Sequence, residues 1–542
     1  MSALALFVLL AAQSVATADT NTTYASFSND LTGKIQPFAL FSSQTNEVDS
    51  APLNVIQGMV PTWLSGTLYR VGSGMFEIGN RRVNNLVDGL SKVHSWAFIP
   101  GKRPRFTAKF LQSKLYNKTL RTGNFPAMQH MGDMIPDLSF WEKLGVEAAL
   151  MTYGSMDNNN VAVWELSKAS GGICVTTESP LYIDVDPETL QFKKEYHVVP
   201  KDFGMMEKEL ISATHFARHP SSGDSINYKF VLAMNPLASS GYHMIRYSDN
   251  AKGKLIATKI GFVPVPMGDV GIVHSLGATE NYAILPRFCL GFSMGSMVSM
   301  CENISFKHNK KTIFDVVALK DGKHTAFEFP AGESQHIINS YERFNKKNEL
   351  EIVVDYPTKN DVSKYPKECV FQLLNVDRLK DDNYSYQEHW ECFSDMVIRR
   401  YILNMETKVG TIYEFPKMWN PKVLQVEFPY MNDNYRGLPY CYSYFHAWQY
   451  DVKNSMGLIK IDMCKETSIG WEEQNKFTVE PIFAPRPGAT AEDDGVVFSP
   501  VFDSSTNITE LYIWNATDLS VLAILDSPFV VPFTLHGVWK QD

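Results

Sequence analysis

The sequence lacks the motifs and composition of several common functional classes. Its 542 residues contain no Walker loop, no HExxH zinc-protease motif and no EF-hand calcium loop. No two cysteines are spaced as CxxC, which argues against a cysteine-bound zinc site. The formal net charge is −9, so the chain offers no basic field to nucleic acid. No long apolar run follows the first residues, so a bundle of transmembrane helices is not expected.

The N-terminal residues are typical of a secretory signal peptide. Residues 3–12 form an apolar run that is too short to span a membrane comfortably, and small residues ending at Ala18 follow it. We therefore predict a signal peptide over residues 1–18 and a single domain over residues 19–542. The residues before the run include no Lys or Arg, so an uncleaved anchor is the alternative.

Glycosylation sequons and cysteines also bear on the compartment. Seven cysteines are too few for a disulfide scaffold, and we expect one or two disulfides beside free buried thiols. Several sequons behind a leader indicate a lumenal or secreted surface, which could also be peripherally attached to a membrane. The sequon asparagines are Asn21, Asn117, Asn303, Asn383, Asn507 and Asn515.

Short β-prone runs separated by turn signals dominate the rest of the chain. The clearest runs lie at 181–186, 228–234, 281–285, 350–355, 399–405, 457–462, 495–502 and 511–514. Amphipathic helices are rare, and the best candidate covers residues 140–151. Many short strands and few helices predict an all-β sandwich, barrel or propeller, and the length favours a propeller.

Two stretches rich in Met and Phe interrupt this strand pattern. They cover residues 125–151 and 288–300. Such side chains either fill irregular parts of a core or form an exposed apolar surface, and the composition does not decide between these two interpretations.

Four of the thirteen histidines share a similar local setting. His215, His274, His336 and His536 each lie in or beside a short apolar run, at separations of 59, 62 and 200 residues. The last separation is about three times the other two, so all four could point at the axis of one propeller. A ring of neutral imidazoles suits iron, copper or zinc. Taken singly, each histidine is more often a hydrogen-bonded core residue.

Three glutamates interrupt apolar stretches in the same way. Glu178, Glu427 and Glu480 would be costly to bury without a partner. Metal-bound imidazoles need an acceptor for their second nitrogen, which these carboxylates could supply. The alternative is that they face water on edge strands.

These segments together resemble the carotenoid cleavage oxygenase family, which includes β-carotene oxygenases and the retinoid isomerase of the visual cycle. The likeness covers residues 66–539. It is carried by GTLYRVGSG (66–74), VDGL (87–90), DPETL (186–190), VHSLG (273–277), QHIINSYE (335–342), VEFPYMN (426–432), EPIF (480–483), EDDGVV (492–497) and PFTLHG (532–537). The resemblance implies a seven-bladed β-propeller with a metal site on its axis and a loop and helix cap over one face.

The resemblance also implies roles for individual residues. His215, His274, His336 and His536 look like the four ligands of one Fe(II) per chain, with Glu178, Glu427 and Glu480 as the carboxylates behind them. His219 competes with His215, because the family often has His-Pro where this chain has His219-Pro220. Thr177 matches a position that lines the reaction site, so Thr177 and Glu178 are the expected catalytic residues.

The activity that the resemblance implies is oxidative cleavage of a polyene. O2 and a carotenoid or retinoid-like substrate would give two carbonyl products. A retinoid isomerase with the same site, and a secreted non-catalytic carotenoid-binding protein, are the alternatives. The family's Phe-Asp-Gly is Val87-Asp88-Gly89 here, and Gly-Pro-Gly is Gly72-Ser73-Gly74, which leaves the subgroup and the substrate open.

The resemblance finally implies how the substrate arrives. The two Met- and Phe-rich stretches fall where the family carries its membrane-facing surface around a tunnel mouth. A peripheral membrane or lipid-carrier contact follows from this, because a carotenoid is nearly insoluble in water. The residues expected at this surface are Phe288, Phe292, Met294 and Met297.

Overall fold

Antiparallel strands make up most of the regular structure, which confirms the all-β class. The computed structural model describes residues 37–153, 157–166, 172–200, 207–233, 239–266, 269–292, 298–300, 304–307, 309–359, 396–419, 423–449 and 455–542. The predicted signal peptide lies outside these residues, so its cleavage site and the domain boundary at residue 19 stay predictions. Residues Gln36–Asp542 form one compact unit.

The eight predicted runs all coincide with strands. The run at 495–502 lies in β34 (Gly495–Asp503), which is buried at every position. A strand with both faces covered needs apolar residues on both, and this explains its continuous hydrophobicity. The run at 399–405 falls largely in β26 (Met396–Asn404), where buried and half-buried residues largely alternate. That pattern is typical of a strand with one covered face.

The strands form antiparallel sheets that we call blades and number along the chain. Blade 1 contains β1 (Val48–Pro52), β3 (Gly66–Met75), β6 (Leu90–Phe98), β7 (Arg105–Phe110) and the C-terminal β37 (Thr534–Gln541). Blade 2 contains β9 (Ala162–Trp164), β10 (Ile173–Thr176), β11 (Tyr182–Val185) and β12 (Phe192–Tyr196). Blade 3 contains β13 (Glu207–Ile211), β14 (Ala217–Arg218), β15 (Ser225–Ala233), β16 (Gly241–Asp249) and β17 (Leu255–Pro264). Blade 4 contains β18 (Gly277–Ala278), β19 (Tyr282–Arg287), β22 (Thr312–Ala318) and β23 (His324–Phe329).

The later blades include a ten-stranded sheet that divides into two halves. Blade 5 contains β24 (Asn339–Phe344), β25 (Leu350–Lys359), β26 and β27 (Gly410–Glu414). Blade 6 contains β28 (Val423–Tyr430), β29 (Tyr442–Gln449), β30 (Met456–Asp462) and β31 (Thr467–Trp471). Blade 7 contains β32 (Lys476–Thr478), β33 (Ile482–Pro485), β34, β35 (Ile508–Asn515), β36 (Val521–Leu525) and β2 (Val55–Gly58). The two halves join through one parallel bridge, Met456 to Phe477.

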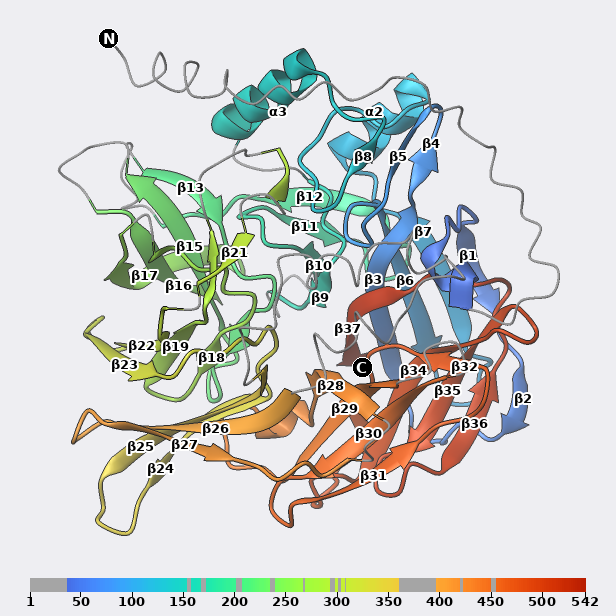
Figure 1. The fold of residues 1–542 in the computed structure, drawn as a ribbon. Coiled ribbons are helices and arrows are strands. Elements are labelled where there is room, and N and C mark those ends of the chain that lie inside the picture. The colour runs from blue at the N-terminus through green and yellow to red at the C-terminus, as the bar shows by residue number, and fades with distance from the viewer. Residues whose placement is uncertain are drawn as a thin grey trace. The chain divides into compact units, whose positions relative to one another are not determined.

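The blades follow one another as expected of a seven-bladed β-propeller (Figure 1). Strand β9 of blade 2 contacts β3 and β37, β18 contacts both β14 and β24, and β26 contacts β28. Blades 2 and 3 share a core cluster that includes Tyr182 and Tyr247. Strand β33 of blade 7 contacts β37 of blade 1. The first and last parts of the chain therefore meet, and β37 completes the first blade.

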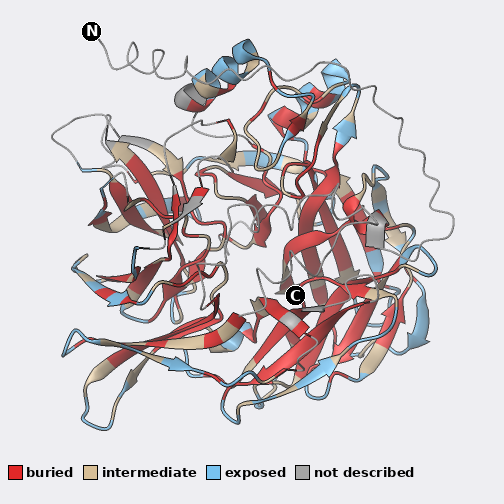
Figure 2. Cartoon of the chain, viewed as in Figure 1, coloured by how far each residue is buried: buried red, intermediate tan, exposed pale blue. Residues whose placement is uncertain are grey.

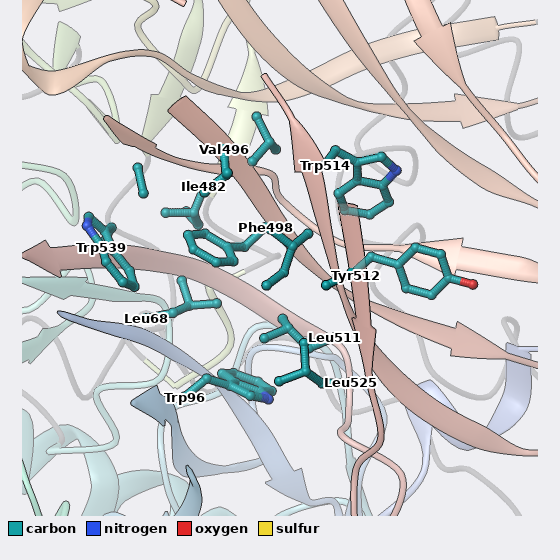
Figure 3. Close-up of a cluster of buried hydrophobic side chains, with 14 of the residues drawn as sticks. Leu68, Trp96, Ile482, Val496, Phe498, Leu511, Tyr512, Trp514, Leu525 and Trp539 are labelled. Atoms are coloured by element: carbon teal, nitrogen blue, oxygen red, sulfur yellow. The ribbon is translucent and has the colours of Figure 1, made fainter. Parts of the chain in front are cut away.

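The contact between blades 7 and 1 is a large aromatic and aliphatic core (Figure 3). Phe498 of β34 stacks on Trp539 of β37, with ring centroids 5.1 Å apart. Leu68 and Trp96 of blade 1 are fully buried in the same cluster. Burial of such side chains contributes about 1.5–3 kcal/mol each. This core fixes β37, which carries His536, against blade 7.

Helices and small strands form a separate layer on the blades. Helices α2 (Lys114–Thr122) and α3 (Phe140–Tyr153) lie near the short strands β4 (Glu77–Ile78), β5 (Arg81–Val83) and β8 (Met134–Ile135). Leu115 and Val146 bury their side chains in a cluster that also holds Phe477 and Phe502 of blade 7. Exposed residues are prominent on α3 (Figure 2). Among the described helices, none is long and apolar enough to cross a bilayer.

Candidate metal centre

The structure brings His215, His274, His336 and His536 together. One ring nitrogen from each lies within 4.8 Å of the others. His336 and His274 lie shortly before the first strands of blades 5 and 4, His215 lies just before β14, and His536 lies in β37. His215 also forms an isolated bridge with Ser275, so the loops that carry the first two histidines are tied together. The histidines therefore converge from separate blades.

The ring orientations are set by the three predicted glutamates. Nδ1–H of His336 donates to Oε2 of Glu427 at 2.7 Å, and Nδ1–H of His536 donates to Oε1 of Glu480 at 2.8 Å. Nδ1–H of His274 donates to Oε1 of Glu178. A neutral imidazole carries one proton, so these contacts leave Nε2 of each ring as a lone pair.

The three Nε2 atoms face one another at short range. Nε2 of His336 lies 3.1 Å from Nε2 of His274 and 3.2 Å from Nε2 of His536. Lone pairs that approach in this way repel unless a cation lies between them. Metal–imidazole bonds are about 2.0–2.1 Å long, which places nitrogens at right angles about 3 Å apart. The observed spacing fits a metal ion with neighbouring imidazoles at right angles.

His215 completes the set without a carboxylate of its own. Its ring centroid lies 4.2 Å from that of His536 and 4.8 Å from that of His274. Its Nε2 is buried and has no hydrogen-bond partner among the residues that the structure describes. A buried nitrogen of this kind is unfavourable unless a ligand satisfies it, and a metal ion at the cluster would do so.

Lowered pKa values keep three of the histidines, His215, His336 and His536, neutral, as metal ligands must be. Burial holds the pKa of His215 and His536 well below the usual range, and burial also lowers the pKa of His336. Burial tends to raise the pKa of Glu178, but its contacts with His274 bring the pKa to about 2. Burial raises the pKa of Glu480 to about 8, and the nearby Arg70 opposes that rise.

His219, the competitor of His215, lies outside this cluster. Its Nε2 is 3.0 Å from the carbonyl oxygen of Glu280, and its Nδ1 accepts the backbone N–H of Ser222 at 3.2 Å. These contacts hold the turn between β14 and β15. The geometry therefore favours His215 as the residue that faces a metal.

Thr177 is attached to the cluster through a glutamate. Its hydroxyl donates to Oε2 of Glu178 at 3.1 Å, and the residue is half-buried. Glu178 contacts His274 through its other oxygen. Both predicted catalytic residues thus lie behind the imidazole of His274.

Two residues beside the cluster were not singled out from the sequence. The ring of Phe428 lies 5.2 Å from that of His336 and 5.0 Å from that of His536, on a backbone with φ of 53°. A left-handed backbone is rare for a bulky residue, and no sequence pattern signals it here. Arg70 is fully buried beside Glu480. Its only signal was a charge inside the apolar segment at 66–74.

The expected membrane-facing role of Phe288 does not agree with its position. Phe288 is only 8% exposed, and its ring packs 5.2 Å from Tyr356 and 5.9 Å from Phe314 in the core of blades 4 and 5. An aromatic side chain packed between blades cannot also contact lipid. Strand β20 (Leu290–Phe292) contains Phe292, whose side chain is outside the described part, as are Met294 and Met297.

The described sequons lie at the surface. Asn117 and Asn507 are exposed, and Asn515 is half-buried. Asn21, Asn303 and Asn383 lie outside the described residues. Cys441 and Cys464 form a disulfide, and Cys174 and Cys289 are buried free thiols.

Known proteins match this chain over nearly its whole length. The family model described as retinal pigment epithelial membrane protein matches residues 41–541. The carotenoid cleavage dioxygenase 8 homolog A of Oryza sativa is 24% identical over 89% of this chain and 84% of its own. The β,β-carotene 15,15′-dioxygenase of Rattus norvegicus is 23% identical over 90% of this chain and 88% of its own.

Solved structures show the same fold. A variant of the Synechocystis apocarotenoid oxygenase aligns with a TM-score of 0.72 and 21% identity, over 94% of this chain and 100% of that one. A cobalt-substituted form of that oxygenase aligns with a TM-score of 0.73 over 93% of this chain and 98% of its own.

Proposed function

This chain belongs to the retinal pigment epithelial membrane protein family, and we propose that it is a non-haem Fe(II) dioxygenase that cleaves a conjugated double bond of a carotenoid or apocarotenoid. Its matched relatives are named as carotenoid oxygenases, which supports this substrate class. The observation that carries the proposal is the convergence of three Nε2 lone pairs at 3.1 and 3.2 Å, each opposite a carboxylate-bound Nδ1.

The donor set fits iron. Four neutral imidazoles leave a divalent ion with its full charge and with positions open in an octahedral shell. Bound there, Fe(II) would supply the binding and activation of O2, which protein side chains cannot provide alone.

The residues of the chain would position and insulate this centre. Glu178, Glu427 and Glu480 hold each Nδ1 proton, so that the opposite nitrogen remains a donor to the metal. The carboxylates also partly offset the positive charge of the ion. Phe428 places an apolar ring against His336 and His536, which limits the access of water on that side.

The proposal is tested by product analysis of the iron-loaded protein. We expect a panel of carotenoids and retinoids to include one substrate that is converted into two carbonyl fragments, detected by mass, with the His336→Ala protein inactive as control. Products with the mass of the substrate would instead identify a retinoid isomerase. Tight polyene binding without turnover in the iron-loaded protein would identify a carotenoid-binding protein.

We also infer that the protein acts in the secretory pathway. The apolar leader, the exposed Asn117 and Asn507 sequons and the Cys441–Cys464 disulfide support this location. Disulfides persist in oxidising compartments and are rare in the cytosol.

We further infer that α3 attaches the enzyme to a lipid surface. Phe140 is 61% exposed, Trp141 is 75% exposed and Leu144 is 42% exposed. Residues spaced by three or four positions share one face of a helix, so these side chains form one apolar patch. An apolar helix face of this kind can lie in the boundary between headgroups and acyl chains.

A further inference from the structure

Arg70 of β3 is a fully buried cation beside the fourth histidine. Its Nε–H donates to the hydroxyl of Thr534 at 2.7 Å, and one terminal nitrogen donates to the carbonyl oxygen of Glu480 at 2.8 Å. The other terminal nitrogen contacts the carbonyl oxygens of Thr534 and Leu535 at 3.4 and 3.3 Å. The rigid planar fork of a guanidinium presents donors from three nitrogens to fixed acceptors at once, whereas a lysine donates from a single nitrogen on a flexible chain.

These contacts join the two chain segments that form one histidine–carboxylate pair. Glu480 precedes β33 of blade 7, whereas Thr534 and Leu535 lead directly to His536 in blade 1. The carboxylate of Glu480 accepts Nδ1–H of His536 through Oε1 and the backbone N–H of Gly537 through Oε2. The same Oε2 lies 3.8 Å from the guanidinium. Arg70 therefore contacts both sides of the pair that orients His536.

The glycine after His536 leaves the space that this arrangement requires. The register of β3 and β37 places Arg70 opposite Gly537. A Cβ at Gly537 would lie 2.8 Å from Cγ of Arg70 and 2.4 Å from the carbonyl oxygen of Tyr69. The arginine side chain can thus cross β37 closely enough to reach Glu480.

The His536–Glu480 pair is the most deeply buried of the three histidine–carboxylate pairs, since the side chains of His336 and Glu427 are 13% and 9% exposed. The side chains of His536 and Glu480 are 4% and 6% exposed, whereas that of Glu178 is 28% exposed. A carboxylate withdrawn from water is costly unless it is paired and fully hydrogen-bonded. Within the described residues, neither Glu178 nor Glu427 has an arginine within ion-pair distance.

We propose that Arg70 is a positioning residue for the metal centre, which fixes Glu480 and the start of β37 so that Nε2 of His536 points at the ion. This inference rests on the proposed function, because it requires that the four histidines bind a metal. Arg70 would act through Glu480 and the backbone, without touching the substrate or the ion. Its loss should weaken one ligand and leave the other three in place.

Arg70→Lys tests this role, because it keeps the positive charge and removes the fork. We expect the variant to fold and its iron dissociation constant to rise about 10–100-fold, the usual scale for residues behind metal ligands. We also expect an altered electron paramagnetic resonance spectrum of the ferrous protein treated with nitric oxide, since this spectrum reports the ligand geometry.

Arg400→Lys is the matched control. Arg400 makes a two-pronged pair with the buried Asp355 in blade 5, at 2.9 and 2.8 Å, and joins strands without contacting the cluster residues. We expect it to lower the unfolding temperature while leaving the iron affinity and the spectrum unchanged. If Arg70→Lys behaves like Arg400→Lys in both readouts, Arg70 is only structural and the proposal is wrong.

Thr534→Val provides a milder second variant. It removes the hydroxyl that accepts Nε–H of Arg70 and nearly conserves the shape of the side chain. If Arg70→Lys does not fold, a severalfold loss of iron affinity in folded Thr534→Val supports the proposal, and an unchanged affinity overturns it. Wild-type protein that binds no iron would contradict the proposed function itself, which separates that failure from a failure of Arg70 alone.

Discussion

Oε2 of Glu427 accepts two hydrogen bonds, one from Nδ1–H of His336 at 2.7 Å and one from the backbone N–H of Phe428 at 2.8 Å. The second contact holds the carboxylate in the position that the imidazole requires. Glu427→Gln keeps the shape and removes the charge, so we expect iron affinity to fall about 10–100-fold. Competition with a metal chelator would measure this. An affinity equal to that of wild type would show that the carboxylate charge does not matter to the site.

The two neighbouring histidines of blade 3 should behave differently. His215→Ala removes a nitrogen that faces the cluster, so we expect most iron and all activity to be lost. His219→Ala should retain about one iron per chain, because His219 contacts Glu280 and Ser222. Elemental analysis of both purified variants measures the difference. If His219→Ala loses the iron and His215→Ala retains it, His219 is the metal ligand and His215 is not.

Glu333 should make the protein less stable as the pH rises. It is 3% exposed, its Oε2 has no hydrogen-bond partner in the described part of the chain, and burial raises its pKa to about 8. The unfolded carboxyl ionises near pH 4.5, so stability is fully present below that pH and is lost as the pH rises towards 8. We expect Glu333→Gln to raise the unfolding free energy at pH 8 by about 3–5 kcal/mol.

Denaturant unfolding at pH 5, 7 and 8 measures the effect of Glu333→Gln. The exposed Glu328 offers a control, because Glu328→Gln should leave the pH dependence unchanged. If the unfolding free energies of wild type and Glu333→Gln change in parallel with pH, the Glu333 carboxyl is ionised in the folded protein.

Much of the candidate site could be predicted from the sequence, because its residues occur in similar local sequence contexts. The four histidines and three glutamates each interrupt an apolar strand context. The strands could be predicted for the same reason, since runs such as 350–355 in β25 are continuous and β-prone. The sequence also predicts helix α3, but it does not predict the shorter and mostly polar α2.

The remaining features depend on contacts between distant segments and on backbone conformations, which no local sequence pattern indicates. Arg70 reaches Glu480 only because β3 pairs with β37, more than 460 residues further along the chain. Phe428 contacts two histidines through a left-handed backbone that its residue type disfavours. Phe288 was misplaced because an apolar stretch has the same composition whether it packs between blades or faces lipid.

The proposed secretory location predicts a processed and glycosylated protein. Expressed in a eukaryotic host, the mature chain should begin near Asp19 and lose mass on treatment with an N-glycosidase. N-terminal sequencing and mass spectrometry measure both. Asn507→Gln should remove one glycan, because Asn507 is exposed in a turn. An intact Met1 and an unchanged mass after the treatment would place the protein in the cytosol.

The exposed face of α3 predicts attachment to membranes. Phe140, Trp141 and Leu144 are exposed large apolar residues of this helix, and the Phe140 and Trp141 rings lie 5.3 Å apart. Changing all three to Ser should weaken liposome binding roughly tenfold or more, since each side chain loses apolar area that lipid would cover. Turnover of carotenoid delivered in liposomes should fall as well, while iron content and turnover of detergent-solubilised substrate stay unchanged.

The control for this triple variant is a pair of exposed apolar residues on another part of the chain. Phe344 is 67% exposed and Val409 is 56% exposed, both in blade 5 away from α3. The Phe344→Ser, Val409→Ser protein should bind liposomes as wild type does. Isolated exposed apolar residues are common on protein surfaces and do not form a continuous apolar helix face that can insert into a bilayer. An equal loss of liposome binding in both variants would indicate a nonspecific effect of the more polar surface. If wild-type protein does not sediment with liposomes, α3 is not a lipid anchor, and a soluble carrier must deliver the polyene.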